Sequence, residues 1–133
     1  MKTYSIGEAA RHSGVKVPTI RYYEIIGLMP APPRADNDRR VFDHVALERL
    51  TFIRQARTMG FETKEIAALL SFRDNPRQSC AKVDEIAHTR LNDIEERIRQ
   101  LQTLRDELKI MIESCASERV GDCQIIGGIS ERC

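Results

Sequence analysis

Short runs of apolar residues with helical spacing alternate with glycine-containing breaks in the first part of the chain. Ser5 and Glu8 stand three residues apart, as in a capping box, and predict a helix over about residues 6–12 that Gly14 ends. Apolar spacing resumes at once and predicts a second helix over about 17–26. Two short helices joined by a glycine-containing turn are typical of a helix-turn-helix.

A polar segment rich in turn residues follows the two helices. Residues 29–38 contain three prolines, two aspartates and one asparagine, which predicts a loop, and residues 39–42 resemble the end of a short strand. Together, residues 29–42 therefore predict a wing beside the helix-turn-helix.

Two further helices are predicted before the middle of the chain. Asp43 can cap a helix over roughly 44–59, and Thr63 can cap another over roughly 64–72. The side chains expected to face the core of these helices are Val45, Leu47, Leu50, Phe52, Ile53, Met59, Ile66, Leu69 and Leu70.

A long uninterrupted helix is predicted between Cys80 and Cys115, a stretch with neither glycine nor proline. Apolar residues recur there in steps of three and four, the spacing of a coiled-coil seam. They lie at positions 87, 91, 94, 98, 101, 108 and 112, and Arg105, with Leu104 beside it, occupies the seam position between 101 and 108. Such a helix would be roughly 50 Å long. It could pack on its own domain, but that domain is too short to cover its length, so we expect a second copy of the chain as its partner.

These patterns predict a mainly α fold with three parts. Residues 1–75 form a winged helix-turn-helix DNA-binding domain, and 79–115 form a dimerisation helix that pairs in an antiparallel coiled coil. Residues 116–133 form a metal-binding loop followed by a tail, which we expect to fray from Gly127 onward.

Charge and composition sharpen this organisation. The formal net charge is only +1, yet residues 1–60 hold 10 Lys/Arg against 6 Asp/Glu, whereas 61–133 hold 11 against 14. A basic N-terminal half favours a nucleic-acid module. No apolar run is long enough to span a membrane and no signal-peptide core is visible, so we expect a cytoplasmic protein. Four cysteines in a reducing compartment favour metal ligands or redox groups over structural disulfides.

Several polar side chains could contact DNA. In the second helix, Ile20 and Tyr23 can face inward, which leaves other positions for the major groove and the phosphates. The predicted DNA-binding residues are Lys16, Thr19, Arg21 and Tyr22, with Arg39 and Arg40 in the wing. The alternative is that these are ordinary solvated side chains.

Three cysteines could form a metal site. Cys115 and Cys123 flank a short loop, and thiolates are soft ligands suited to Zn, Cd, Pb, Hg or Cu(I). Cys80 stands at the other end of the long helix, so one ion cannot bind it and Cys115 within one chain. In an antiparallel dimer, Cys80 of the partner subunit would lie beside Cys115, and we predict a site of these three thiolates. His88 and Cys133 are accessory ligands or play no part.

The sequence resembles the DNA-binding domain of the MerR family. The segments that carry the resemblance are Tyr4-Ser5-Ile6-Gly7-Glu8-Ala9-Ala10, Thr19 to Leu28 with Ile20-Arg21-Tyr22-Tyr23-Glu24 at its centre, Arg40-Val41-Phe42, Leu50-Thr51-Phe52-Ile53 and Met59-Gly60-Phe61. The likeness extends over residues 4–126, with a departure at Asp38-Arg39-Arg40, where the family often has Gly-Tyr-Arg. It implies a homodimer on double-stranded promoter DNA that distorts the promoter for RNA polymerase holoenzyme when an inducer binds.

The resemblance also bears on the inducer. Metal-sensing members place a cysteine pair in the loop, and sensors of divalent ions add a cysteine where this chain has Cys80. Copper(I) sensors share the loop spacing but usually have serine there. A third thiolate favours a +2 ion, so we expect a Zn(II), Cd(II) or Pb(II) sensor that controls metal resistance, with Hg(II) or Cu(I) as alternatives.

Other functions fit the sequence less well. A thiol redox sensor using Cys115 and Cys123 stays open, whereas a multidrug sensor would need a longer C-terminal ligand domain. A purely architectural DNA-binding dimer would not need the cysteines. No nucleophile–base pair or phosphate loop is visible, so we do not expect an enzyme.

Overall fold

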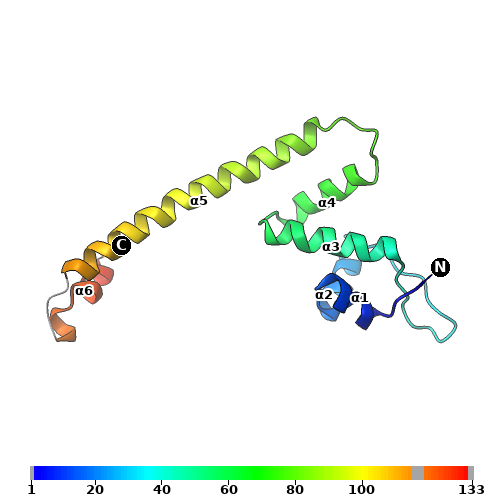
Figure 1. Cartoon of the computed structure of the whole chain (residues 1–133), viewed down its shortest axis with the longest axis horizontal. Helices are drawn as coiled ribbons and strands as arrows, with labels where there is room; N and C mark the ends of the chain where they lie inside the picture. Colours follow the sequence, from blue (N-terminus) through cyan, green and yellow to red (C-terminus); the bar gives the residue numbers. More distant parts are fainter. Residues whose placement is uncertain (1, 115–118, 132–133) are drawn as a thin grey trace. The chain divides into compact units, whose positions relative to one another are not determined.

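The chain is mainly α-helical, as predicted. The computed structural model describes residues 2–114 and 119–131, and it divides into two compact units, Met1–Ile86 and Ala87–Cys133 (Figure 1). The helices are α1 (Ile6–Ser13), α2 (Val17–Ile25), α3 (His44–Thr58), α4 (Thr63–Arg73), α5 (Ala81–Ser114), the 3-10 turn η1 (Val120–Asp122) and α6 (Gln124–Glu131). None of the described helices has the length and apolar character needed to cross a membrane.

Local hydrogen bonds build the helix-turn-helix. The predicted capping box is confirmed: Ser5 N donates to Glu8 Oε1 at 3.0 Å, and Glu8 N donates to Ser5 Oγ at 3.2 Å. At the turn, the buried Ser13 hydroxyl donates to the Ala9 carbonyl at 2.7 Å and accepts from Val15 N at 3.2 Å. Gly14 has φ +75°, the left-handed conformation that glycine adopts without strain. The turn between α1 and α2 is therefore held by local hydrogen bonds.

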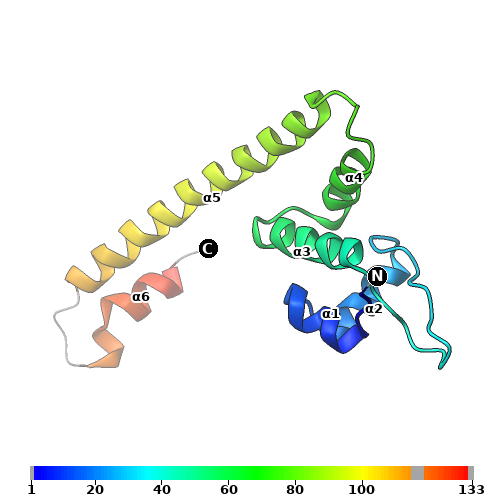
Figure 2. The ribbon, with the colours of Figure 1, turned by 45° about the vertical axis from the view of Figure 1, so that its right-hand side comes forward.

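One hydrophobic core holds the first unit together, with α1 against both α2 and α3, and α4 against α3 (Figure 2). The buried apolar side chains are Ala9, Val15, Ile20, Tyr23, Leu28, Met29, Phe42, Leu47, Leu50, Ile53, Ala56, Ile66 and Leu70. Arg49 of α3 adds polar connections to two other segments: its Nε donates to the Leu28 carbonyl at 2.8 Å, and its Nη1 forms an ion pair with Asp74 at 3.2 Å.

The wing forms, but with less strand than predicted. Isolated bridges pair Arg34 with Arg40 and Tyr4 with Phe42, and no longer strand is present among residues 2–114 and 119–131. Tyr4 and Phe42 exchange two backbone hydrogen bonds of 2.7 and 2.8 Å, which tie the N-terminal segment to the base of the wing. The chain reverses at Asp38, whose φ is +64°.

Three details of α3 and α4 differ from the expectations. Val45 and Met59 are exposed rather than inward, because α3 buries only the stripe that contains Leu47, Leu50 and Ile53. The N-cap of α4 is Glu62 rather than Thr63: Glu62 N donates to Glu65 Oε1 at 2.8 Å. The carboxylate three residues downstream satisfies the cap backbone, so the helix begins one residue earlier than expected.

The second unit contains most of α5 and the C-terminal segment. The helix α5 has 34 residues, and none of them is buried. The expectation of a frayed tail is wrong for residues 127–131, which belong to α6. Gly128 of α6 lies beside the Met111 side chain of α5: a Cβ at this position would lie 2.9 Å from the Met111 methyl carbon, so a larger residue requires this flexible side chain to shift.

Candidate nucleic-acid interface and cysteine positions

The second helix presents a single exposed face. Pro18, Arg21, Tyr22 and Ile25 are exposed and recur at helical spacing, whereas Ile20 and Tyr23 are buried as expected. Ile25, which was not among the predicted residues, is 82% exposed. Its position four residues after Arg21 could have identified it. A face with a cation, a phenol and an apolar side chain can meet phosphates, sugars and thymine methyl groups.

The two other predicted residues of this region lie at the start of the helix. Lys16 is the N-cap residue of α2 and is exposed, and Thr19 is half-buried. No side chain makes the cap hydrogen bond at Lys16. Backbone N–H groups at a helix start are suited to anions, and an ammonium group beside them adds to that suitability.

The two arginines of the wing have different surroundings. Arg39 is exposed, and its backbone N donates to Asn37 Oδ1 at 3.1 Å. Arg40 instead pairs with Glu24 of α2, with 3.0 Å between Arg40 Nε and Glu24 Oε2. Sequence spacing does not indicate this pairing, because the two residues are 16 positions apart.

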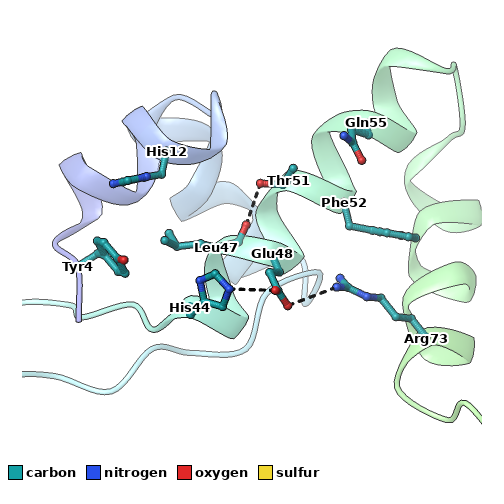
Figure 3. Close-up of a pocket in the computed structure, with 9 residues that line it drawn as sticks. All are labelled: Tyr4, His12, His44, Leu47, Glu48, Thr51, Phe52, Gln55 and Arg73. Carbon is teal, nitrogen blue, oxygen red and sulfur yellow. Dashed lines mark hydrogen bonds and ion pairs between the residues drawn. The ribbon is translucent and has the colours of Figure 1, made fainter. Parts of the chain in front are cut away.

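A cleft of about 470 Å³ with polar and apolar lining residues lies on the first unit (Figure 3). Tyr4, His12 and residues of α3 and α4 line it, and Glu48 joins two of its walls. His44 Nε2 lies 3.0 Å from Glu48 Oε1, and Arg73 Nη2 lies 3.9 Å from Glu48 Oε2. The Arg73 guanidinium also lies over the Phe52 ring, 5.1 Å from its centroid. The network connects α4 to α3, and neither of the two described cysteines lines this cleft.

The structure describes two of the three predicted metal ligands. Cys80 is exposed just before α5 and lines a cavity of about 300 Å³ with apolar neighbours that include Phe72 and Val83. Cys123 is half-buried between η1 and α6. Cys115 and Cys133 lie outside the described residues. Within residues 2–114 and 119–131, no three His, Cys, Asp or Glu side chains are grouped so that they could hold a metal ion. His88 is exposed on α5.

Known proteins resemble this chain over most of its length. The family model described as "MerR HTH family regulatory protein" matches residues 4–72, and the one described as "MerR, DNA binding" matches 47–111. The HTH-type transcriptional regulator CueR of Salmonella typhi is 36% identical over 129 residues, which cover 97% of this chain and 94% of that protein. HmrR of Rhizobium leguminosarum bv. viciae is 35% identical over 127 residues, which cover 96% of this chain and 98% of that protein.

Two solved structures are similar over nearly the whole chain. The regulator PbrR691 of Ralstonia metallidurans CH34, in complex with lead(II), has a TM-score of 0.78 and 32% identity, and the match covers 95% of this chain and 98% of that one. MerR of Bacillus megaterium MB1, in complex with mercury(II), has a TM-score of 0.69 and 28% identity, with 96% and 100% covered.

Proposed function

Because the chain belongs to the MerR family of helix-turn-helix transcriptional regulators, we propose that it is a metal-responsive activator. It binds promoter DNA as a homodimer, and a Zn(II)-, Cd(II)- or Pb(II)-type ion on its cysteine thiolates switches on genes of metal resistance or efflux. The inducing ion distorts the promoter through the dimer, so that RNA polymerase holoenzyme can use it.

The observation that carries the proposal is the apolar stripe of α5. Its members are Leu91, Ile94, Ile98, Leu101, Leu104, Leu108 and Ile112, and all are exposed. They recur in steps of three and four, which is the spacing of a coiled-coil seam. A second copy of α5 would bury this stripe along its whole length.

The positions of the cysteines indicate how the pairing of two α5 helices would build a metal site. Cys80 directly precedes α5 and Cys115 directly follows it, and a helix of 34 residues is roughly 50 Å long. In an antiparallel pair, the start of one α5 faces the end of the other. Cys80 of the partner subunit would then complete a site with Cys115 and Cys123.

The chemistry of these donors fits a soft metal ion. Thiolates bind zinc and the heavier soft ions, and three thiolates suit a +2 ion better than the linear geometry of Cu(I). The lead(II) complex of the similar regulator PbrR691 supports a divalent ion, and the mercury(II) complex of MerR supports the Hg(II) alternative. Copper(I) is the other alternative, because copper(I) sensors share the loop spacing of this chain.

The test is competitive metal titration of the reduced full-length dimer, together with run-off transcription from its own promoter. Cys80→Ser should abolish induction by Zn(II), Cd(II) and Pb(II) while operator affinity stays within about twofold. Cys133→Ser is the comparison variant: induction equal to that of the unmodified chain would show that Cys133 plays no part, and a weakened response would make it an accessory ligand. Loss of operator binding in Cys80→Ser would contradict the proposal, because it would make Cys80 a structural residue.

Two further outcomes decide between the alternatives. Activation by an oxidant without any metal would replace the metal sensor with a thiol switch on Cys115 and Cys123. Full induction by Cu(I) that survives Cys80→Ser would assign the site to Cu(I) on the two loop cysteines alone.

A further inference from the structure

An ion pair joins the wing to the second helix, and its partners are unequally buried. Arg40 Nε donates to Glu24 Oε2 at 3.0 Å. The Glu24 side chain is only 11% exposed, whereas that of Arg40 is 29% exposed. The other carboxylate oxygen, Glu24 Oε1, is buried and has no hydrogen-bond partner within the described part of the chain. Arg40 is therefore the cation on which this carboxylate depends.

The hydrogen bond to Glu24 uses only one of the donors of Arg40. A guanidinium group has five N–H donors in a rigid fork, and Nε supplies only one of them. The two Nη groups carry the other four, and they are the groups that bind a phosphate in the bidentate manner. A carboxylate that holds Nε fixes the direction of these donors.

The pair also joins the two elements that carry the predicted DNA-binding residues. Glu24 follows Arg21 and Tyr22 on α2, and Arg40 follows Arg39 in the wing. The wing itself is closed by a separate contact, in which Arg34 Nη1 donates to the Asp38 carbonyl at 2.8 Å. The Glu24–Arg40 pair is thus a connection between wing and helix rather than a part of the wing turn.

We infer that Glu24 is a positioning residue for DNA binding, which holds Arg40 so that its Nη groups meet a backbone phosphate beside the recognition helix. This inference rests on the proposed function. It assigns an acidic side chain a favourable role in binding DNA, which is itself negatively charged. Removal of the Glu24 charge should therefore weaken DNA binding, whereas simple charge repulsion predicts the opposite.

The substitution Glu24→Gln keeps the shape and removes the charge. By simple Coulomb repulsion, the loss of a negative charge near DNA should tighten binding. If Glu24 positions Arg40, binding should instead weaken by roughly tenfold, the effect of removing one charge-assisted hydrogen bond. The dependence of log Kd on log salt should also flatten by about one unit for each phosphate that the protein no longer binds.

The measurement is fluorescence anisotropy of the full-length chain with a DNA duplex, over a series of salt concentrations. The duplex is one that the unmodified chain enriches from a randomised library.

Glu48→Gln is the matched control, because it removes the same charge from the same unit at α3. Its binding should be unchanged or slightly tighter. Arg40→Lys should resemble Glu24→Gln, since an ammonium lacks the fork that contacts a carboxylate and a phosphate together. The double variant should be no weaker than either single one.

The outcomes separate this inference from the function on which it rests. If no duplex is enriched by the unmodified chain, the proposed function fails. If the chain binds and Glu24→Gln binds equally or more tightly, the positioning role is wrong. Weaker binding with an unchanged salt slope, or with a lowered melting temperature that accounts for it, would likewise overturn it in favour of a purely structural ion pair.

Discussion

The two units of the chain differ in whether their regularly spaced leucines are buried. In the first unit, Leu50 and its neighbours from α1, α2 and α4 are buried in one core. In the second, the leucines of α5 have helical spacing just as regular, but none of them is buried. The first unit buries its apolar surface in its own core, whereas the second leaves the apolar stripe of α5 exposed. Similar hydrophobic patterns can therefore encode either a buried core or an exposed stripe, and the proposed dimer would cover the latter.

The largest effect should come from the core of the first unit. Leu50→Ala removes a fully buried side chain where α3 packs on its neighbours, and we expect a loss of about 2–5 kcal/mol in the free energy of unfolding. Because the core lies within one chain, the loss should not depend on protein concentration. Chemical denaturation followed by circular dichroism at two concentrations measures it. A loss that vanished at high concentration would contradict this contrast between the units.

The same substitution in α5 should act on association instead. Leu101 is 54% exposed in the single chain, so Leu101→Ala should leave the first unit intact. It should raise the dimer dissociation constant by about tenfold to a hundredfold, from the ~1.5–3 kcal/mol that a buried leucine contributes. Analytical ultracentrifugation measures this change.

The control for Leu101→Ala is Ile110→Ala on the same helix. Ile110 is also exposed but lies off the stripe, between Leu108 and Ile112. Its substitution should leave the dissociation constant within about twofold. Equal effects of both substitutions would show that the stripe is not the seam.

A smaller effect tests how tightly the first unit is specified at its turn. Gly14 has φ +75°, and a Cβ there would lie 2.9 Å from Arg54 Nε. We expect Gly14→Ala to destabilise the first unit by about 1–2 kcal/mol from backbone strain, and somewhat more from the Arg54 contact. Gly27→Ala is the matched control, because Gly27 has φ +85° but nothing within 4 Å of its Cβ position. Arg54→Ala should reduce the cost of Gly14→Ala to that of Gly27→Ala in thermal unfolding, and an additive double variant would contradict this coupling.

Features carried by local spacing could be predicted from the sequence. Residues within a few positions of one another determine the Ser5–Glu8 capping box and the left-handed Gly14. The extent of α5 follows from a stretch without glycine or proline. The exposed apolar stripe of α5 could be recognised because its period persists over many turns.

Features that depend on tertiary geometry could not be predicted in this way. The Glu24–Arg40 pair joins residues 16 positions apart, and nothing in their spacing indicates which other charges lie nearby. The helix α6 is not indicated by the sequence, because Gly127 and Gly128 lower helix propensity, although in the structure Gly128 lies beside the Met111 side chain. The predicted thiolate site depends on a second chain, so it stays a prediction of the sequence.

The smallest effect concerns an exposed group of the first unit, the Glu8 carboxylate. Its pKa is lowered below the ordinary value, first by the hydrogen bond from the Ser5 backbone N–H and then by that from the Ser5 hydroxyl. A carboxyl whose pKa is lower in the folded state stabilises the fold when ionised. Its contribution is therefore full above the pKa of an unfolded glutamate, ~4.3, and is lost as the pH falls through the lowered folded value. Thermal unfolding of the unmodified chain and of Glu8→Gln should differ at neutral pH and converge in acid. If the stability difference between the unmodified chain and Glu8→Gln stayed constant with pH, the Glu8 charge would not contribute, and this helix cap would stabilise the first unit only through its neutral hydrogen bonds.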